Sequence, residues 1–148
     1  MQKLNLPTYN FKLKSKENKT LIFDNLRKKY MVLTPEEWVR QHFVSFLIHE
    51  KNFPNSLIAI EKQLTVNNIK KRSDILVFNS SGKPHIIVEC KAPSIKITQD
   101  TFDQIARYNL KLKANFLIVT NGLEHFCCKM DFENEAYVFL KEIPSYNS

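Results

Sequence analysis

The chain has 148 residues, of which 43% are hydrophobic and 25% charged, and this length and composition are those of one ordinary globular domain. With only two glycines, the sequence excludes a flexible linker or a low-complexity segment. The net charge of +7 favours a polyanionic partner, nucleic acid ahead of an anionic membrane, and the lack of a long apolar run or a signal-peptide core predicts a soluble, cytoplasmic protein with no membrane partner.

The first 30 residues are rich in lysine and only weakly patterned, and their basic side chains fall in two groups, at 12–19 and 27–29. We predict a basic arm here, irregular or containing a hairpin, ahead of a single domain over residues 31–148. Charge runs of this kind are usually solvated surface, and they also suit contacts with backbone phosphates.

A helix is predicted from Pro35 to about residue 50. Thr34 can cap its N-terminus, Pro35 suits the first turn, and Glu37 stands where the carboxylate of a capping box belongs. The apolar residues that follow recur at helical spacing: Val39, Phe43, Phe46 and Leu47.

Three strands are predicted next, over residues 57–61, 74–78 and 85–91, with a turn at 79–84 between the last two. The second and third strands lack polar alternation, as expected of strands that are buried on both faces. Glu61, which ends the first strand, has the character of an ordinary edge residue.

A second helix is predicted over residues 98–112, followed by a strand at 116–119 and by two segments that can form edge strands, at 124–129 and 136–140. The residues of this helix expected to be buried are Phe102, Ile105 and Leu112. The order of elements (αβββαβ, with extra C-terminal strands) predicts an α/β domain in which helices flank a central mixed β-sheet.

The turn at 79–84 is centred between Ser81 and Gly82. Symmetric pairing about that centre places Asp74 opposite Glu89, and it also pairs Leu76 with Ile87 and Phe78 with His85. Opposed residues have Cβ atoms about 5 Å apart. Lys91 is two residues beyond Glu89 and therefore projects from the same face.

Two opposed carboxylates repel each other unless a cation lies between them. A site with only a few protein ligands, all of them oxygen atoms, suits Mg²⁺, because this ion takes its remaining ligands from water and phosphate. Lys91 could then orient the attacking water and stabilise charge on the transition state. The alternative interpretation of Asp74, Glu89 and Lys91 is a salt-bridged sheet end, and a second Glu-x-Lys at 17–19 has no predicted role.

The chain has an odd number of cysteines, namely Cys90, Cys127 and Cys128. Two that are adjacent in sequence seldom form a disulfide with each other, because the geometry is strained. No C-x-x-C pair indicates structural zinc. We expect reduced thiols that pack as small hydrophobic side chains.

Asp74 and the later Glu89-Cys90-Lys91 resemble the signature of the PD-(D/E)xK nucleases, and Gln104 with Tyr108 is similar to the Q-x-x-x-Y motif of some branches. Four longer segments together resemble the N-terminal nuclease domain of type I restriction enzyme R subunits, over roughly residues 30–125: Thr34-Pro35-Glu36-Glu37-Trp38-Val39-Arg40-Gln41, Lys71-Arg72-Ser73-Asp74, Glu89-Cys90-Lys91-Ala92-Pro93 and Thr120-Asn121-Gly122.

The resemblance implies a restriction-endonuclease-like core and a Mg²⁺-dependent deoxyribonuclease, with Mn²⁺ as the alternative ion. Asp74, Glu89 and the backbone carbonyl of Cys90 would bind the metal, and Lys91 would be the catalytic lysine. Glu37 is the weakest candidate ligand, because the capping box gives it a structural role.

By the same resemblance, Gln104 and Tyr108 would support the site or contact the DNA backbone; otherwise they form an ordinary polar pair. Lys70, Lys71 and Arg72 would hold DNA phosphates beside Asp74. Two departures stand out: Ser73 replaces proline before Asp74, and no G-x-x-x-x-G-K-[ST] phosphate loop is present, so the expected nuclease has no ATPase motor.

Three alternatives stay open. The chain could be a catalytically silent DNA-binding or assembly module, or it could act on branched DNA or RNA in place of ordinary duplex. It could also work as a homodimer or together with partner restriction subunits. Endonuclease and exonuclease action are not distinguished.

Overall fold

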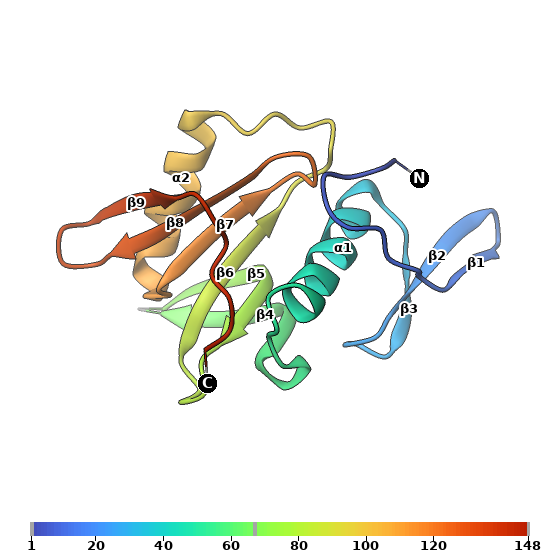
Figure 1. Ribbon diagram of the computed structural model, residues 1–148, viewed down its shortest axis with the longest axis horizontal. Coiled ribbons are helices and arrows are strands. Elements are labelled where there is room, and N and C mark those ends of the chain that lie inside the picture. The colour runs from blue at the N-terminus through green and yellow to red at the C-terminus, as the bar shows by residue number, and fades with distance from the viewer. Residues whose placement is uncertain (1, 67, 148) are drawn as a thin grey trace.

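The computed structural model describes residues 2–147 except residue 67, and for residues 66, 69 and 71 it describes the backbone only. Two β-sheets and two α-helices make up the fold (Figure 1). Their bounds in chain order are β1 Leu13–Lys16, β2 Lys19–Asp24, β3 Lys29–Val32, α1 Pro35–His49, β4 Ile58–Val66, β5 Ile69–Phe78, β6 Pro84–Cys90, α2 Gln99–Asn109, β7 Phe116–Thr120, β8 His125–Asp131 and β9 Ala136–Leu140.

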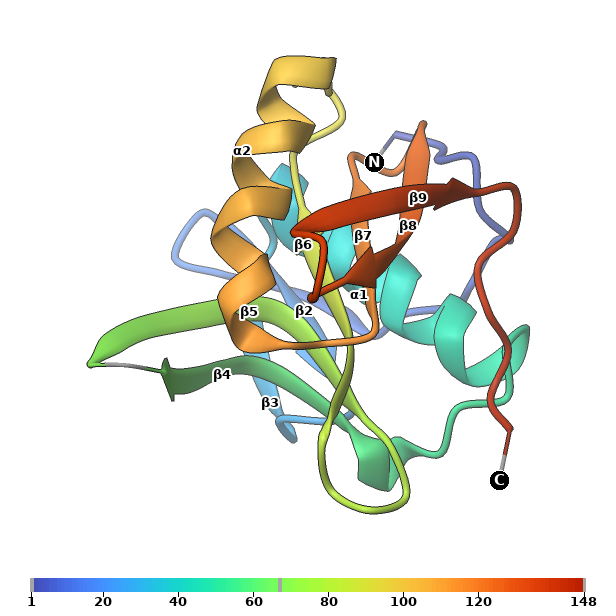
Figure 2. The same ribbon diagram turned by 90° about the vertical axis from the view of Figure 1, so that its left-hand side faces the viewer.

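The central sheet has six strands in the order β4-β5-β6-β7-β8-β9. Its strands are antiparallel except for β6 and β7, which run parallel because the chain crosses over through α2 between them. The sheet is therefore mixed, as predicted. Figure 2 shows α1 and α2 on opposite sides of it. Among the described helices, none is long and apolar enough to cross a membrane.

Each face of the sheet has its own hydrophobic core. Val88 and Ile118 face α1 and pack with Phe43, whereas Ile87 and Leu117 face α2 and pack with Phe102. The strands at the centre of the sheet are thus apolar on both faces, which explains the missing polar alternation in their sequences.

Helix α1 begins where the sequence predicts, because the Thr34 hydroxyl accepts a hydrogen bond from the N–H of Glu37 at 3.0 Å. Helix α2 is capped in the same way by Thr98 and continues into a 3₁₀ turn at Leu110–Leu112. The predicted helix over 98–112 is thereby confirmed, with Phe102 and Leu112 buried and Ile105 only partly buried.

The hairpin of β4 and β5 differs from the prediction. Both strands are longer than expected, and residues 70–72 lie within β5 and pair with β4. The missed signal is Asn68, which has the left-handed φ of 65° that short hairpin loops need. Leu57 belongs to a short 3₁₀ turn and not to the strand.

The predicted register of β5 and β6 is confirmed at Leu76 and Ile87, which are partners. The predicted pair of Phe78 with His85 is wrong, because a register shift after Val77 makes Phe78 the partner of Pro84. The shift lies at the turn end of the hairpin and leaves the opposite end undisturbed.

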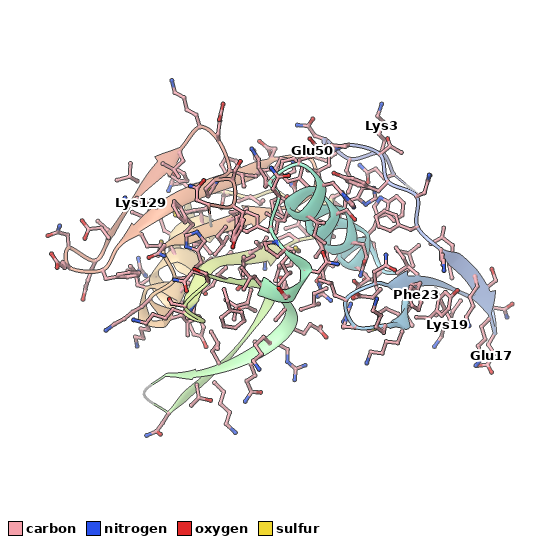
Figure 3. The ribbon with its side chains drawn as sticks, turned by 60° about the horizontal axis from the view of Figure 1, so that its bottom comes forward. Lys3, Glu17, Lys19, Phe23, Glu50 and Lys129 are labelled. Carbon is pink, nitrogen blue, oxygen red and sulfur yellow. The ribbon has the colours of Figure 1, made fainter. Side chains whose placement is uncertain are left out.

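The N-terminal arm is an ordered three-stranded antiparallel sheet of β1, β2 and β3. It projects beyond α1, on the far side of that helix from the central sheet (Figure 1). Figure 3 shows Lys19 and Phe23 on this sheet. The segment before it returns to the domain, where Leu4 is buried in the core on the α1 side.

Candidate active site

Asp74 lies between two other acidic residues in neighbouring strands. In the β4–β5 pairing, Ile60 is the partner of Ile75 and Lys62 of Ser73, so Glu61 is across from Asp74. In the β5–β6 pairing, Ile75 is the partner of Val88, so the next position places Asp74 across from Glu89. Three acidic residues therefore occupy neighbouring positions on adjacent strands, at the point where β6 ends.

The Asp74 carboxylate already has two partners. Oδ2 accepts the backbone N–H of Cys90 at 2.7 Å, which fixes the end of β6 against the middle of β5. Oδ1 is 3.3 Å from Nη2 of Arg40, which reaches the site from α1. The Asp74 side chain is still 24% exposed, whereas Glu89 is only 9% exposed. The Asp74 carboxylate is thus held in place and stays open to solvent, and Glu89 is buried.

Lys91 follows the last residue of β6, and its N–H donates to the carbonyl of Thr120 at 2.8 Å. Asn121 braces the loop beyond Lys91, because its side-chain amide donates to the carbonyl of Ile95 at 2.8 Å. A Cβ on Gly122, which has a φ of 86°, would come within 2.8 Å of Leu4. The Thr120-Asn121-Gly122 motif therefore positions the backbone around Lys91.

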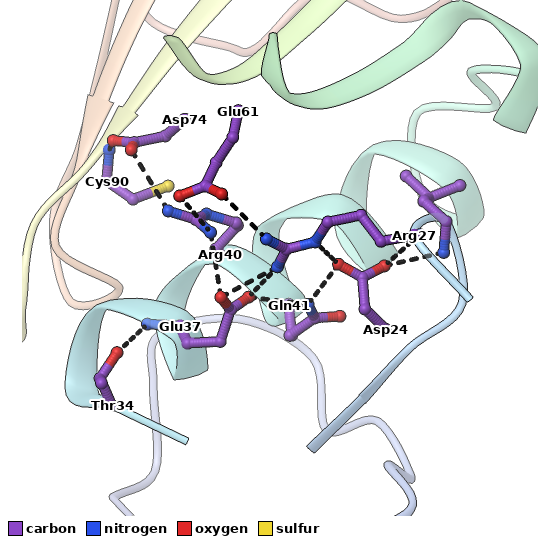
Figure 4. Close-up of polar contacts among 10 residues, drawn as sticks. Asp24, Arg27, Thr34, Glu37, Arg40, Gln41, Glu61, Asp74 and Cys90 are labelled. Carbon is purple, nitrogen blue, oxygen red and sulfur yellow. Dashed lines mark hydrogen bonds and ion pairs between the residues drawn. The ribbon is translucent and has the colours of Figure 1, made fainter. Parts of the chain in front are cut away.

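A network of buried ion pairs extends from Asp74 into the molecule (Figure 4). Nη1 of Arg40 is 2.9 Å from Glu37 and 3.5 Å from Glu61. Arg27, from the turn between β2 and β3, contacts the same two carboxylates at 2.9 and 3.2 Å. Two arginines thus bridge the N-terminal sheet, α1, β4 and β5.

Asp24 ends this network at the N-terminal sheet, where its side chain is fully buried. Burial alone would raise the pKa of Asp24, but hydrogen bonds from Arg27, Leu26 and Gln41 outweigh it and lower the pKa below its ordinary value. Burial alone would lower the pKa of Arg27, and its bonds to Asp24 and Glu37 raise it instead. Both groups are therefore held in their charged forms.

The predicted capping box is only half formed. The Glu37 carboxylate does not return to Thr34 but binds Arg27, Arg40 and Gln41, at 2.8 to 3.0 Å. Two guanidinium groups attract this buried carboxylate more strongly than one backbone N–H can. Glu37 is consequently linked to Asp74 through a single side chain, that of Arg40.

Sequence reasoning missed Arg27, Arg40, Asp24 and Glu61 as members of this site. Arg27 stands in a basic run that resembles solvated surface, and here its side chain is only 14% exposed. Glu61 adopts a left-handed φ of 54°, which is costly for a residue with a Cβ and often marks functional sites. The one available signal was the helical spacing of Glu37 and Arg40, three residues apart.

The predicted phosphate-binding residues lie on β5. Lys70 and Arg72 are exposed and alternate with Asp74 along the strand, so all three share one face. The side chain of Lys71 lies outside the described residues. Gln104 and Tyr108 stand one turn apart on α2 and are exposed, Tyr108 by 44%.

All three cysteines are free and buried, as predicted. Burial and the nearby Asp74 and Glu89 carboxylates raise the pKa of the Cys90 thiol well above its ordinary value. Burial also raises the pKa of Cys127 to about 11 and that of Cys128 to about 12. These thiols stay protonated at neutral pH, which makes them poor nucleophiles and poor metal ligands.

The donor atoms at Asp74 suit a hard divalent cation such as Mg²⁺. In the described part of the chain, no three His, Cys, Asp or Glu side chains are grouped to hold a metal ion. Mg²⁺ needs fewer, because it commonly uses one or two carboxylates and keeps several waters. Asp74 and Glu89 provide two, and a cation at Asp74 would share that carboxylate with Arg40.

The chain is similar to known proteins in sequence and in fold. A family model described as the type I restriction enzyme R protein N terminus (HSDR_N) matches residues 35–144. A structure from Vibrio vulnificus YJ016, provisionally described as an HsdR subunit fragment of a type I restriction enzyme, is 22% identical with a TM-score of 0.53 and covers 78% of this chain. This chain spans only 24% of that one, and no curated protein matches.

A second structure, from Anabaena variabilis and provisionally described as a nuclease of the DUF820 group, is 15% identical with a TM-score of 0.49. The similarity covers 93% of this chain and 80% of the Anabaena chain. At these identities the Vibrio structure bears on the fold alone.

Proposed function

This chain belongs to the family of type I restriction enzyme R protein N termini, and from that premise we propose that it is a metal-dependent nuclease that hydrolyses phosphodiester bonds in DNA. The observation that carries the proposal is the register of β5 and β6, which sets Asp74 across from Glu89, with Lys91 two residues further on. Two carboxylates and a lysine at the end of an apolar sheet are the groups that this chemistry needs.

In the proposed mechanism, Asp74, Glu89 and the carbonyl oxygen of Cys90 would hold Mg²⁺, or Mn²⁺ in its place. The ion would supply Lewis acidity, which polarises the phosphate and makes a water molecule more acidic. Lys91 orients the attacking water and stabilises the negative charge that develops on the phosphate.

Other residues bind and orient the DNA in this proposal. Lys70 and Arg72 hold backbone phosphates next to Asp74, whose face of β5 they share. Gln104 and Tyr108 contact the DNA backbone from α2. Because phosphate contacts do not read bases, we expect cleavage with little sequence preference.

The second candidate function is a catalytically silent DNA-binding or assembly module. The observation that favours it is the ion pair of Arg40 with Asp74, at 3.3 Å, which neutralises one of the proposed metal ligands. A salt-bridged sheet end of this kind needs no metal.

Lys91→Ala distinguishes the two functions. With supercoiled, linear and branched DNA and Mg²⁺, we expect wild-type cleavage and a loss of about 10²–10⁴-fold in the variant, because general acid–base and charge contributions of this kind have that size. Lys96→Ala is the matched control, an exposed lysine in the loop that follows. Equal cleavage by both variants, at equal melting temperatures, would remove Lys91 from the mechanism.

A further inference from the structure

One face of the N-terminal sheet carries lysines from two of its strands. The pairings Lys14 with Leu21, Lys16 with Lys19 and Phe23 with Tyr30 put alternate residues on the same side. We call this the lysine face; its members are Lys12, Lys14, Lys16, Lys19, Leu21, Phe23, Tyr30 and Val32. The opposite side holds Ile22 and Asp24, which are fully buried.

The lysine face is strongly and uniformly basic. All four of its lysines are exposed, and none of its eight residues is acidic. Among the described residues, its lysines form no ion pair, since the ion pairs there involve Arg27 and Arg40. Four positive charges therefore face solvent without an ion-pair partner among the described residues.

Aromatic rings hold two of these lysines in place. Nζ of Lys14 is 4.0 Å from the ring centre of Tyr30, and Nζ of Lys12 is 5.6 Å from that of Phe23. Such cation–π contacts restrict where the ammonium groups lie, so less side-chain entropy is lost when a ligand binds. The rings thus restrict the positions of two of the four charges.

The sheet below the lysine face is fixed to the domain. Asp24 ends β2 and binds both Arg27 and Gln41, which is on α1, and Arg27 in turn binds Glu37. The lysines accordingly keep a constant position relative to α1, unlike those of a flexible basic tail.

From this geometry we propose that the lysine face binds the phosphate backbone of duplex DNA, without reading sequence and outside the cleavage site. Alternate residues of a strand are about 6.7 Å apart, so the row from Lys12 to Lys16 covers about 13 Å, enough for several phosphates of one DNA strand. The proposal rests on the proposed function only in taking DNA as the ligand.

The test is the salt dependence of DNA binding by the full chain, measured by fluorescence anisotropy with EDTA and a labelled duplex of about 20 base pairs. The variant replaces Lys12, Lys14 and Lys16 with glutamine. Each lost phosphate contact should reduce the log–log salt slope by about 0.9, so the triple variant should lose between about 2 and 3.

The matched control replaces three other exposed lysines, Lys111, Lys113 and Lys129, and should keep the wild-type slope. Arginine at positions 12, 14 and 16 should restore binding, because the phosphate needs charge and not lysine itself. A glutamine variant that melts like wild type and binds with the wild-type slope overturns the proposal and favours an acidic protein as the ligand. Because EDTA prevents metal-dependent cleavage, this result is independent of whether the chain is a nuclease.

Discussion

The buried arginines of the ion-pair network and the exposed lysines of the lysine face are close in sequence but opposite in environment. Arg27 and Arg40 are 14% and 8% exposed and together contact four carboxylates. Lys12, Lys14 and Lys16 of the lysine face are exposed, and the first two lie against aromatic rings. Within one short segment, the arginines therefore form buried ion pairs, whereas the lysines form part of the surface.

The division follows from side-chain chemistry. Guanidinium groups present several donors in a rigid plane and are more weakly hydrated than ammonium groups, so they suit a crowded set of buried carboxylates. Ammonium groups are strongly hydrated point charges on flexible stems, and they remain at the surface. In the run 27–29, only the arginine points inward, and both lysines are exposed.

Removing one buried arginine is the strongest way to test this comparison. Arg40→Gln removes the cation that contacts Asp74 and leaves Glu37 and Glu61 with Arg27 alone. The loss of one partner from a buried pair typically costs about 3–5 kcal/mol. We expect a fall of that size in the free energy of unfolding, measured with urea.

Two variants serve as controls for this prediction. Arg107→Gln, at an exposed position on α2, should change stability by no more than about 0.5 kcal/mol. Arg40→Lys keeps the charge but loses the planar guanidinium group. Its free energy of unfolding should therefore lie between those of Arg40→Gln and Arg107→Gln. Equal stability of Arg40→Gln and Arg107→Gln would show that the network contributes little.

Asp74 belongs to the buried network and is also open to solvent, so a divalent ion tests the boundary between the two regions. If Asp74 and Glu89 share Mg²⁺, the ion should raise the melting temperature, by an amount equivalent to about 2.7 kcal/mol at a hundredfold excess over its Kd. Asp74→Ala and Glu89→Ala should each lose most of this response.

The metal response is compared within each variant, because Asp74→Ala also removes a partner of Arg40. Glu133→Ala, at an exposed loop position, is the control and should respond like wild type. Calorimetry that finds equal Mg²⁺ binding by all three variants, or none by wild type even with DNA, would favour the catalytically silent module.

The parts of the fold that depend on neighbouring residues were predictable from sequence. Thr34 and Thr98 cap the two helices as expected, and the pairing of Leu76 with Ile87 follows from the symmetry of one turn. The position of Asp74 across from Glu89 extends that same register. Local capping and alternation determine these features, so the sequence alone contains them.

The parts that depend on distant partners were not predictable. The Arg27 side chain points inward because it binds Glu37 and Glu61, which are 10 and 34 residues away in the sequence. Glu61 is drawn into the site through a left-handed backbone conformation that its sequence does not indicate. The register shift after Val77 is a local exception, which a turn assumed to be symmetric does not predict. Long-range ion pairing is thus where the sequence interpretation stopped.

The smallest expected effect concerns pH and the buried end of the network. The folded-state pKa of Asp24 is lowered from its ordinary value of 3.8, because hydrogen bonds from Arg27, Leu26 and Gln41 outweigh its burial. A lowered folded pKa contributes stability that is present above the unfolded pKa and is lost as the pH falls through the folded one. Urea unfolding of wild type and Asp24→Asn should therefore differ most near pH about 7 and converge below pH about 3.8. In the Arg27→Gln background the difference should shrink at every pH, because the side chain and charge that hold Asp24 ionised are gone. A gap between wild type and Asp24→Asn that stays constant down to the lowest pH would mean that Asp24 acts through packing and not through its charge.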